Sequence, residues 1–288
     1  MKIVVTGGTG LVGSHVARSL LERGMDVTVP SRSEERLNTL PDGVEGVVGD
    51  LARPGTIRTV FQGADAVFLL NPVSMTELHE GLMAVNGVLG SGVRRIVYLS
   101  VHEAQSMPLA PHFAAKVAVE RALKESDLEW TVLRPNNFYQ NDVWFQQPIA
   151  EYGVYPQPIG SRGLSRVDVR DIAEAAATAL TESGHAGETY DLVGPEPWTG
   201  DRTATVWAEA LGRDVRYAGD DLDAWEAQSV EFLPDWMVYD FRVMYDLFQR
   251  RGLIGSDEAL RRQETLIGHG PRTFEDFARE IAEVWTGA

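Results

Sequence analysis

The sequence predicts an α/β protein in which helices cover both faces of a doubly wound parallel sheet. Short apolar runs rich in β-branched residues alternate with longer amphipathic segments along the first half of the chain. Each run is too short for a helix and apolar throughout, as in a strand buried on both faces. A glycine-rich loop joins the first run to the first amphipathic segment. The 288 residues suffice for about two domains, or one large unit with an added lobe.

The apolar runs predict six buried strands. They lie at residues 3–5, 27–29, 46–48, 66–70, 96–99 and 130–133. Between the first two, Val12, Val16 and Leu20 recur at four-residue spacing and predict a helix over residues 11–23, which Gly24 ends. Repeated strand–helix–strand units form a parallel sheet, and such a sheet binds ligands at the carboxyl ends of its strands.

The pattern changes after Arg134. Asparagines, prolines and glycine interrupt an irregular passage before a predicted helix over 169–182 and a strand over 188–193. Helical patterns follow at residues 202–211, 222–230, 237–251 and 273–284. We therefore expect residues 1–135, joined by residues of about 164–195, to form the sheet domain. Residues 136–163 and 196–288 are expected to form a smaller, mostly helical lobe over the open end of the sheet.

Composition and charge exclude several classes of protein. The net charge of −16 repels phosphate backbones and anionic membranes at long range, so bulk nucleic-acid binding is not expected. The absence of cysteine excludes disulfides, thiol catalysis and thiolate zinc sites. The N-terminal apolar run is far shorter than a signal-peptide core, and no run approaches the ~20 residues of a membrane span. We expect a cytoplasmic monomer or homodimer with no membrane partner.

Residues 6–13, Thr-Gly-Gly-Thr-Gly-Leu-Val-Gly, lie between the first strand and the first helix. Glycines here allow a tight turn, a close approach of the backbone to a pyrophosphate, and close packing of helix on strand, while the helix N-terminus supplies amide donors. The alternative is a glycine turn that binds no ligand. We expect a Rossmann-type dinucleotide site made by Thr6, Gly7, Thr9, Gly10, Leu11, Val12 and Gly13.

The end of the second strand indicates which dinucleotide binds. An NAD site usually places Asp or Glu there to bind the ribose hydroxyls, but this chain has Ser31 and Arg32. Arg32 can pair with a 2′-phosphate through a charge-assisted fork, and Ser31 can add a hydroxyl contact. The alternative is a solvated arginine paired with Glu34 or Glu35. NADPH is the expected cofactor of the sheet domain, with NADH disfavoured.

Three segments carry a resemblance to a known family. Residues 6–13 resemble the signature of the atypical short-chain dehydrogenase/reductases. Residues 133–138 (Leu-Arg-Pro-Asn-Asn-Phe) and 167–173 (Val-Asp-Val-Arg-Asp-Ile-Ala) resemble the NmrA-like branch of that family. The resemblance implies a Rossmann fold and a nicotinamide cofactor. It also implies similarity to NAD(P)H-dependent quinone and triphenylmethane reductases, and to redox sensors that bind the cofactor without turnover.

The resemblance also assigns residues to the cofactor. Asp50, with Leu51 beside it, takes the position that contacts the adenine, although Asp50 can also serve as the N-cap of the next helix. Asn71 and Pro72 close the fourth strand beside the nicotinamide half. The resemblance places a further group of residues along the cofactor: Ser100, Lys116, Pro135, Asn137 and Phe138.

The superfamily pattern of a Ser and a Tyr-x-x-x-Lys pair is only partly present. Ser100 and Lys116 match it, but His112 stands where the tyrosine is expected. The four-residue spacing puts His112 and Lys116 on one helical face. Lys116 is expected to hold the nicotinamide ribose, with pairing to Glu120 as the alternative. His112 can donate a proton, bind the substrate, or simply be packed or solvated.

The remaining histidines are weaker candidates. His102, two residues beyond Ser100, is a second candidate acid at the substrate. His79, His185 and His269 lie in polar or glycine-flanked surroundings typical of the surface. No pair has metal-ligand spacing supported by nearby carboxylates, so no metal is expected.

Aromatic residues predict where the substrate binds. Phe138, Tyr139, Trp144 and Tyr155 follow the sixth strand, in the region that forms the pocket wall in similar proteins. Residues 225–248, which include Trp225 and Trp236, hold seven of the 25 Trp, Tyr and Phe residues. This cluster can be lobe core, substrate lid or subunit interface, and spacing of three and four residues favours core.

The sequence thus predicts an NADPH-dependent reductase. Its substrate is expected to be a small apolar or aromatic carbonyl, quinone, enone or imine, because aromatic walls suit planar apolar molecules. The first alternative is a cofactor-binding redox sensor without turnover, which the missing tyrosine favours. The second is a non-redox isomerase or cyclase on the same fold.

Overall fold

The computed structural model describes residues 1–287 and contains a seven-stranded parallel sheet. The strand order β3-β2-β1-β4-β5-β6-β8 reverses direction at β1, as in a doubly wound fold. All six strand pairs are parallel. The strands are β1 (Lys2–Val5), β2 (Asp26–Ser31), β3 (Val44–Val48), β4 (Ala66–Leu69), β5 (Arg95–Leu99), β6 (Glu129–Pro135) and β8 (Glu188–Leu192). The predicted fold class is confirmed.

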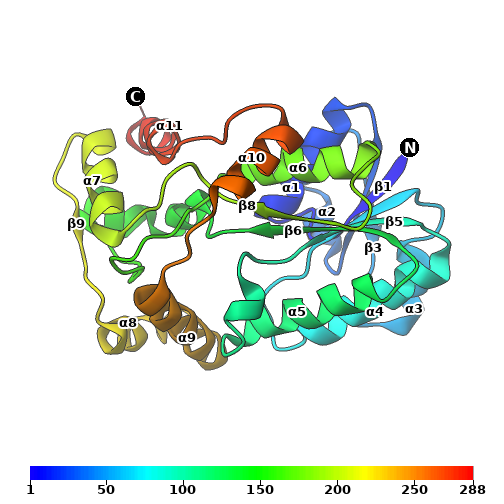
Figure 1. The fold of residues 1–288 in the computed structure, drawn as a ribbon, viewed down its shortest axis with the longest axis horizontal. Coiled ribbons are helices and arrows are strands. Elements are labelled where there is room, and N and C mark those ends of the chain that lie inside the picture. The colour runs from blue at the N-terminus through cyan, green and yellow to red at the C-terminus, as the bar shows by residue number, and fades with distance from the viewer. Residues whose placement is uncertain (288) are drawn as a thin grey trace.

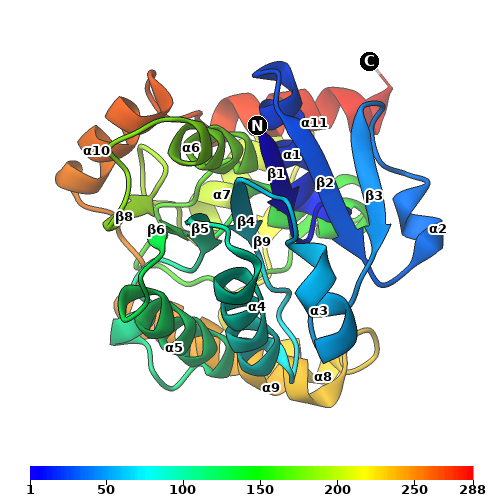
Figure 2. The same ribbon diagram turned by 90° about the vertical axis from the view of Figure 1, so that its right-hand side faces the viewer.

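Helices cover both faces of this sheet, as Figures 1 and 2 show. One face carries α1 (Leu11–Glu22), α6 (Val169–Thr181) and α10 (Asp257–Ile267), and the other carries α3 (Pro54–Val60), α4 (Glu77–Ser91) and α5 (Pro111–Lys124). Each face buries its own apolar cluster against the helices. A one-turn helix, α2 (Glu34–Leu37), lies beside β2 and β3.

The third strand differs from its prediction. It forms over Val44–Val48, but Val48 is 61% exposed, and only Val44 and Val47 of the strand are partly covered. The prediction of a buried strand at residues 46–48 is wrong because β3 is the edge of the sheet and its apolar residues do not face a neighbour on both sides.

Beyond the carboxyl ends of the strands lies a second body of helices, at the left of Figure 1. It contains α7 (Gly200–Leu211), α8 (Leu222–Ser229), α9 (Asp235–Arg251), α11 (Phe274–Thr286) and a short parallel pair, β7 (Val154–Tyr155) with β9 (Arg216–Tyr217). Aromatic rings fill its interior, including Trp198, Trp207, Phe274 and Phe277, all at most 2% exposed.

Helix α10 has no counterpart in the sequence prediction. It packs on α6 and β8, so it covers the sheet although it lies within the C-terminal part of the chain. Its packed face contains Ala259, Gln263 and Leu266. The side-chain oxygen of the buried Gln263 accepts a 2.6 Å hydrogen bond from the backbone amide of Val193, just past β8. Gln263 lies between Ala259 and Leu266 and interrupts the apolar stripe that predicts a helix.

A buried ion pair fastens the helical lobe to the sheet. Arg166 and Asp142 are both fully buried, and an Nη of Arg166 lies 2.6 Å from an Oδ of Asp142. Arg166 also donates to the side chain of Asn137 (3.0 Å) and the carbonyl of Phe138 (2.8 Å), both immediately after β6. Breaking such a pair by removing one partner costs about 3–5 kcal/mol. The segment after β6 is therefore rigidly placed over the end of the sheet.

Within residues 1–287, no helix is long and apolar enough to cross a membrane.

Candidate active site

The loop between β1 and α1 forms a cradle that only glycine permits. Gly7 has φ +67°, and a Cβ added there would lie 2.6 Å from Cδ2 of Leu70. A Cβ at Gly13 would overlap the backbone of Gly7, at 2.5 Å from its carbonyl carbon. The first turn of α1 therefore packs directly on the loop that follows β1, as in the close helix–strand packing of a dinucleotide cradle.

The N-terminus of α1 is open to an anion. Gly10 is the N-cap, and no side chain among residues 1–287 caps the helix. The amides of Leu11, Val12 and Gly13 are thus available as donors at the positive end of the helix dipole. Of the neighbouring predicted residues, Thr9 is half-buried, while the Thr6 hydroxyl is held by the end of β4, 2.9 Å from the Leu70 carbonyl.

Arg32 lies exposed at the end of β2 and forms no ion pair within the described part of the chain. The alternative that it pairs with Glu34 or Glu35 is therefore wrong. Ser31 is half-buried beside it and accepts from the Ser33 amide at 3.2 Å. The free guanidinium and the adjacent hydroxyl fit a 2′-phosphate.

Asp50 and Leu51 follow β3 and are both half-buried. The Asp50 carboxylate accepts from the amide of Ala52 at 2.9 Å and lies 3.3 Å from Nε of Arg53. Arg53, not Asp50, is the N-cap of α3. The alternative role of Asp50 as the helix cap is wrong because the turn that Asp50 closes comes before the helix starts.

Asn71, just after β4, is buried, and neither polar atom of its side chain has a partner among the described residues. Such an orphaned amide fits a ligand group that would satisfy it. Pro72 beside it is exposed, Pro135 is buried at the end of β6, and Asn137 and Phe138 are half-buried just beyond. The cradle, the free Arg32 and the orphaned Asn71 together fit an extended dinucleotide along the carboxyl ends of the strands.

Ser100 is buried and turned toward α5. Its hydroxyl donates to Glu120 at 2.5 Å, and Arg134 donates to both oxygens of the same carboxylate. Burial alone would raise the pKa of Glu120, but the hydrogen bonds from Arg134 and Ser100 lower it below its usual value. Glu120 is thus ionised, and its carboxylate holds both the Ser100 hydroxyl and the Arg134 guanidinium.

Lys116 pairs with Glu77, the first residue of α4. Its Nζ lies 2.7 Å from Oε1 of Glu77, and both residues are buried. Burial raises the pKa of the Glu77 carboxyl above its usual value, although Lys116 acts against this. The alternative that Lys116 pairs with Glu120 is wrong: Lys124 takes that place, at 3.5 Å.

The cluster around Lys116 has unused polar atoms. The other oxygen of Glu77 and the hydroxyl of Tyr98 are buried without partners among residues 1–287. The Lys116 ammonium lies 6.0 Å from the centre of the Tyr98 ring. Burial raises the pKa of Tyr98 well above its usual value, so its phenol is protonated. Lys116 thus stands in a polar cluster between α4, α5 and the sheet.

His112, one helical turn before Lys116, is held by Asp240 of α9. Its Nδ1 lies 2.6 Å from Oδ1 of Asp240, and its backbone amide donates to Oδ2 at 3.2 Å. The ring packs edge-on against Phe113 and Phe241. His112 and Asp240 are both buried, so the pairing is well shielded from water.

A pocket of about 580 Å³ opens beside His112. Its wall is made by the start of α4 (Met75 and Leu78), the start of α5 (His112 and Ala115) and α9 (Trp236, Tyr239 and Asp240), with Glu77 also in the lining. The walls are largely apolar, and the polar groups in the lining come from Ser74, Glu77, His112, Asp240 and the hydroxyl of Tyr239. The volume admits a small aromatic molecule.

Two of the predicted substrate or catalytic residues line this pocket, His112 and Trp236. Lys116 does not line the pocket, but it is hydrogen-bonded to Glu77, which does. Tyr139 and Tyr155 are fully buried in the core of the helical lobe, and Trp225 packs on Tyr245 at its edge.

The other predicted substrate residues lie elsewhere. Trp144 is 73% exposed. His102 is buried with Nδ1 3.2 Å from Asp191, and it points toward the end of β8. The 225–248 cluster is split: Tyr245 and Phe248 are core, Trp236 lines the pocket, and Phe232 and Tyr239 are exposed.

Sequence reasoning missed Glu77 and Asp240. Glu77 resembles an ordinary acidic residue in the first turn of a helix, where it would favour the dipole. Asp240 lies four residues before Met244 and thus on the packed face of α9, where an acidic residue is unusual. That position is the signal by which the sequence could have identified it.

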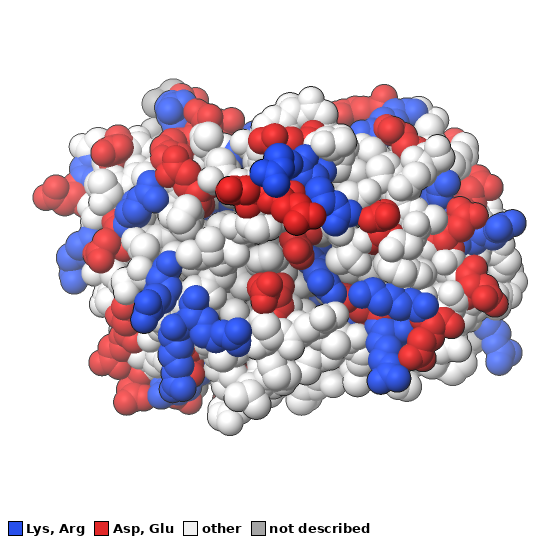
Figure 3. Space-filling view, viewed as in Figure 1, with Lys and Arg blue, Asp and Glu red and all other residues white. Residues whose placement is uncertain are grey.

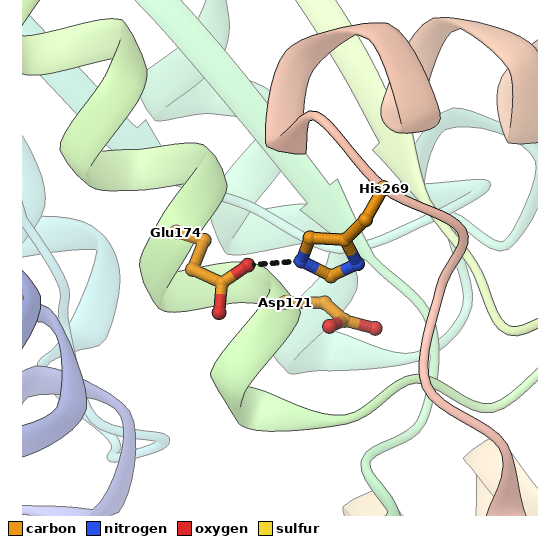
Figure 4. A group of neighbouring side chains, drawn as sticks. All are labelled: Asp171, Glu174 and His269. Atoms are coloured by element: carbon orange, nitrogen blue, oxygen red, sulfur yellow. Dashed lines mark hydrogen bonds and ion pairs between the residues drawn. The ribbon is translucent and has the colours of Figure 1, made fainter.

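One further cluster of titratable groups lies away from this pocket, on the opposite face of the sheet. Figure 4 shows Asp171 and Glu174 of α6 facing His269 from the loop after α10. These groups could offer metal ligands, but Arg272 already pairs with both carboxylates. The guanidinium supplies the cation there, so the cluster acts as a clasp between α6 and the loop.

The surface charge is mixed. On the face shown in Figure 3, acidic and basic side chains are interspersed rather than gathered into one basic patch.

The fold and the cradle define a Rossmann-type NAD(P)-binding protein. Residues 1–278 match the model of the NmrA-like family, and the chain belongs to this family.

Relatives of this chain include two curated reductases and one solved complex. The NAD(P)H azoreductase of Xenophilus azovorans is 29% identical over 99% of this chain and 100% of its own length. The (4-alkanoyl-5-oxo-2,5-dihydrofuran-3-yl)methyl phosphate reductase of Streptomyces griseus is 32% identical over 98% of this chain and 99% of its own. The triphenylmethane reductase of Citrobacter sp., solved with NADP(H), is 25% identical to this chain and superposes with a TM-score of 0.84. The match covers 97% of this chain and 99% of the reductase.

Proposed function

We propose that this protein is an NADPH-dependent reductase that transfers hydride to an apolar or aromatic carbonyl, quinone, enone or imine. One observation carries the proposal. An apolar pocket contains the ring of His112, whose neighbour Lys116 on the same helical face pairs with Glu77, a residue of the pocket lining. The three reductases described above support this class of reaction.

The chain's own residues bind the cofactor along its length. The amides of Leu11, Val12 and Gly13 receive the pyrophosphate, and Arg32 with Ser31 receives the 2′-phosphate. Asp50 and Leu51 lie against the adenine, and Asn71 binds the nicotinamide half. When bound, NADPH supplies the hydride. Lys116 uses one of the three ammonium hydrogens on Glu77, and we expect another to donate to a hydroxyl of the nicotinamide ribose.

His112 supplies the proton. Its Nε2 has no hydrogen-bond partner among the described residues, and its ring lines the pocket. A protonated imidazole there donates Nε2–H to the substrate atom that gains negative charge. Met75, Leu78 and Trp236 line the pocket and would contact the apolar body of the substrate. Ser100 serves the structure through Glu120 rather than the substrate.

Changing the pocket wall tests the proposal. Trp236→Ala is expected to raise KM for the acceptor about tenfold, because a large apolar contact is lost, and to leave the Kd for NADPH within about twofold. Trp144→Ala is the matched control, since Trp144 is 73% exposed and outside the pocket. An unchanged KM in Trp236→Ala, or an equal rise in both variants, would contradict the proposed substrate site.

A further inference from the structure

The contact between His112 and Asp240 joins two bodies of the molecule. His112 is the second residue of α5, a helix that packs on the sheet. Asp240 lies 128 residues later, on α9 of the helical lobe. Asp240 accepts two hydrogen bonds from the same residue, one from Nδ1 at 2.6 Å and one from the backbone amide at 3.2 Å. Asp240 is 4% exposed, so both bonds are shielded from water.

This pairing fixes the proton on the imidazole. An ionised carboxylate only accepts hydrogen bonds, so Nδ1 of His112 must carry a hydrogen. In the neutral ring, Nε2 is then the bare nitrogen. It gains a proton from solvent and presents it to the pocket, and the ring returns to the same tautomer after the proton leaves.

We propose that Asp240 is a positioning residue that sets the tautomer and orientation of His112, so that the helical lobe controls proton donation at the sheet. This inference rests on the proposed reductase function. In the proton step, the Nε2–H bond of His112 breaks and an O–H or N–H bond forms on the reduced substrate. The neutral ring keeps its Nδ1–H bond to Asp240.

Three elements place charged groups around His112. Glu77 approaches from α4, Lys116 lies on α5 itself, and Asp240 approaches from α9. The hydroxyl-bearing Tyr239 also lines the pocket. Of the two carboxylates, Glu77 is paired with Lys116, and Asp240 is in direct contact with the imidazole.

The geometry predicts a specific effect of Asp240→Asn. The backbone amide of His112 still needs an acceptor, so the amide oxygen of the new side chain stays there. Its NH₂ group then faces Nδ1 and can only donate to it. The neutral ring must therefore switch its hydrogen to Nε2, the opposite tautomer from that of the wild type.

The experiment uses ¹⁵N-detected histidine spectra of the full chain, which has six histidines. Wild-type protein is expected to show His112 with hydrogen on Nδ1, and Asp240→Asn is expected to show it on Nε2. His112→Gln assigns the signal. Asp246→Asn is the matched control on the same helix, because Asp246 pairs with exposed Arg250, and it is expected to leave His112 unchanged. This readout requires no turnover, so it separates failure of this inference from failure of the proposed function.

Kinetics provide the second measurement. Asp240→Asn is expected to lower kcat about 100-fold with KM for NADPH unchanged. In a His112→Gln background, the same change is expected to have no further effect on kcat. An unchanged His112 tautomer in Asp240→Asn, or an undiminished loss of kcat in the double variant, would overturn the inference. Should Asp240→Asn fail to fold, Asp240→Glu keeps the carboxylate and is expected to retain the Nδ1–H tautomer.

Discussion

Lys116 and Glu77 form a buried ion pair between two helices, with 2.7 Å between Nζ and Oε1, although the residues are 39 positions apart. The side chain of Lys116 is 11% exposed, and that of Glu77 is 3% exposed. The pair fixes the relative position of α4 and α5 beside the pocket. It also keeps an ammonium group near the expected nicotinamide site.

Lys116→Met leaves Glu77 buried without its cation. The pKa of Glu77 is already raised by burial, and loss of Lys116 raises it further. A carboxyl with a raised folded-state pKa favours the folded state below its unfolded pKa, and this contribution is lost as pH rises through the folded pKa. We expect the variant to lose about 3 kcal/mol at about pH 8 and clearly less at about pH 5.

Urea denaturation at the two pH values measures this difference. Arg121→Met is the control, because Arg121 and Glu125 form an exposed pair whose loss is expected to cost far less stability than the loss of Lys116. A penalty for Lys116→Met that does not change with pH would contradict the assignment of Glu77 as the unpaired group.

Gly13→Ala tests the cradle. The new Cβ would overlap the backbone of Gly7, so α1 must move away from β1. We expect a loss of about 1–3 kcal/mol in stability and a rise of at least about tenfold in the Kd for NADPH. Calorimetry measures the affinity. Gly90→Ala is the control, because a Cβ there meets no atom within 4 Å, and normal NADPH binding by Gly13→Ala would show that this loop does not hold the pyrophosphate.

Arg32→Ala tests the choice of dinucleotide. Arg32 is exposed and unpaired within residues 1–287, so its removal breaks no internal contact. We expect the Kd for NADPH to rise about 10- to 100-fold and the Kd for NADH to change by less than about twofold, because only NADPH carries the 2′-phosphate. Arg36→Ala on the neighbouring α2 provides the comparison. Equal weakening of both cofactors would argue against a phosphate contact.

The clasp of Figure 4 predicts a pH effect on stability. The hydrogen bond to the Gly270 carbonyl, and then that to Glu174, raises the pKa of His269 above its usual value. Stability from a raised histidine pKa is fully present below the unfolded pKa and lost as pH rises through the folded one. His269→Ala is therefore expected to destabilise the protein more at about pH 5.5 than at about pH 9, by less than about 1 kcal/mol because the side chain is 42% exposed. Thermal unfolding measures it, and a larger loss at the higher pH would contradict the pairing.

The sequence was sufficient for the parts of the fold that depend on local pattern. Continuous apolar runs predicted the central strands, and the glycine spacing predicted the strand–loop–helix cradle. The burial of β3 was not predictable in this way, because burial depends on which strand forms the edge. Helix α10 was not predicted because the polar residue Gln263 lies in its packed face.

The site was predictable only where one segment carries it. His112 and Lys116 share one helix, so their common face follows from spacing. Glu77 and Asp240 come from other helices, and their contacts depend on how α4 and α9 pack on α5. The aromatic pattern likewise predicted Trp236 and Tyr139 equally as substrate-binding residues. Trp236 lines the pocket, whereas Tyr139 is buried in the lobe core.

The most direct test of the reductase proposal follows the hydride. NADPH deuterated at its transferable position is incubated with the protein and a panel of quinones, enones, ketones and imines, and the products are analysed by mass spectrometry. We expect deuterium in at least one reduced product, with its rate of appearance strongly lowered in His112→Gln. Tight NADPH binding without deuterium in any product would contradict the proposal and favour a cofactor-binding sensor.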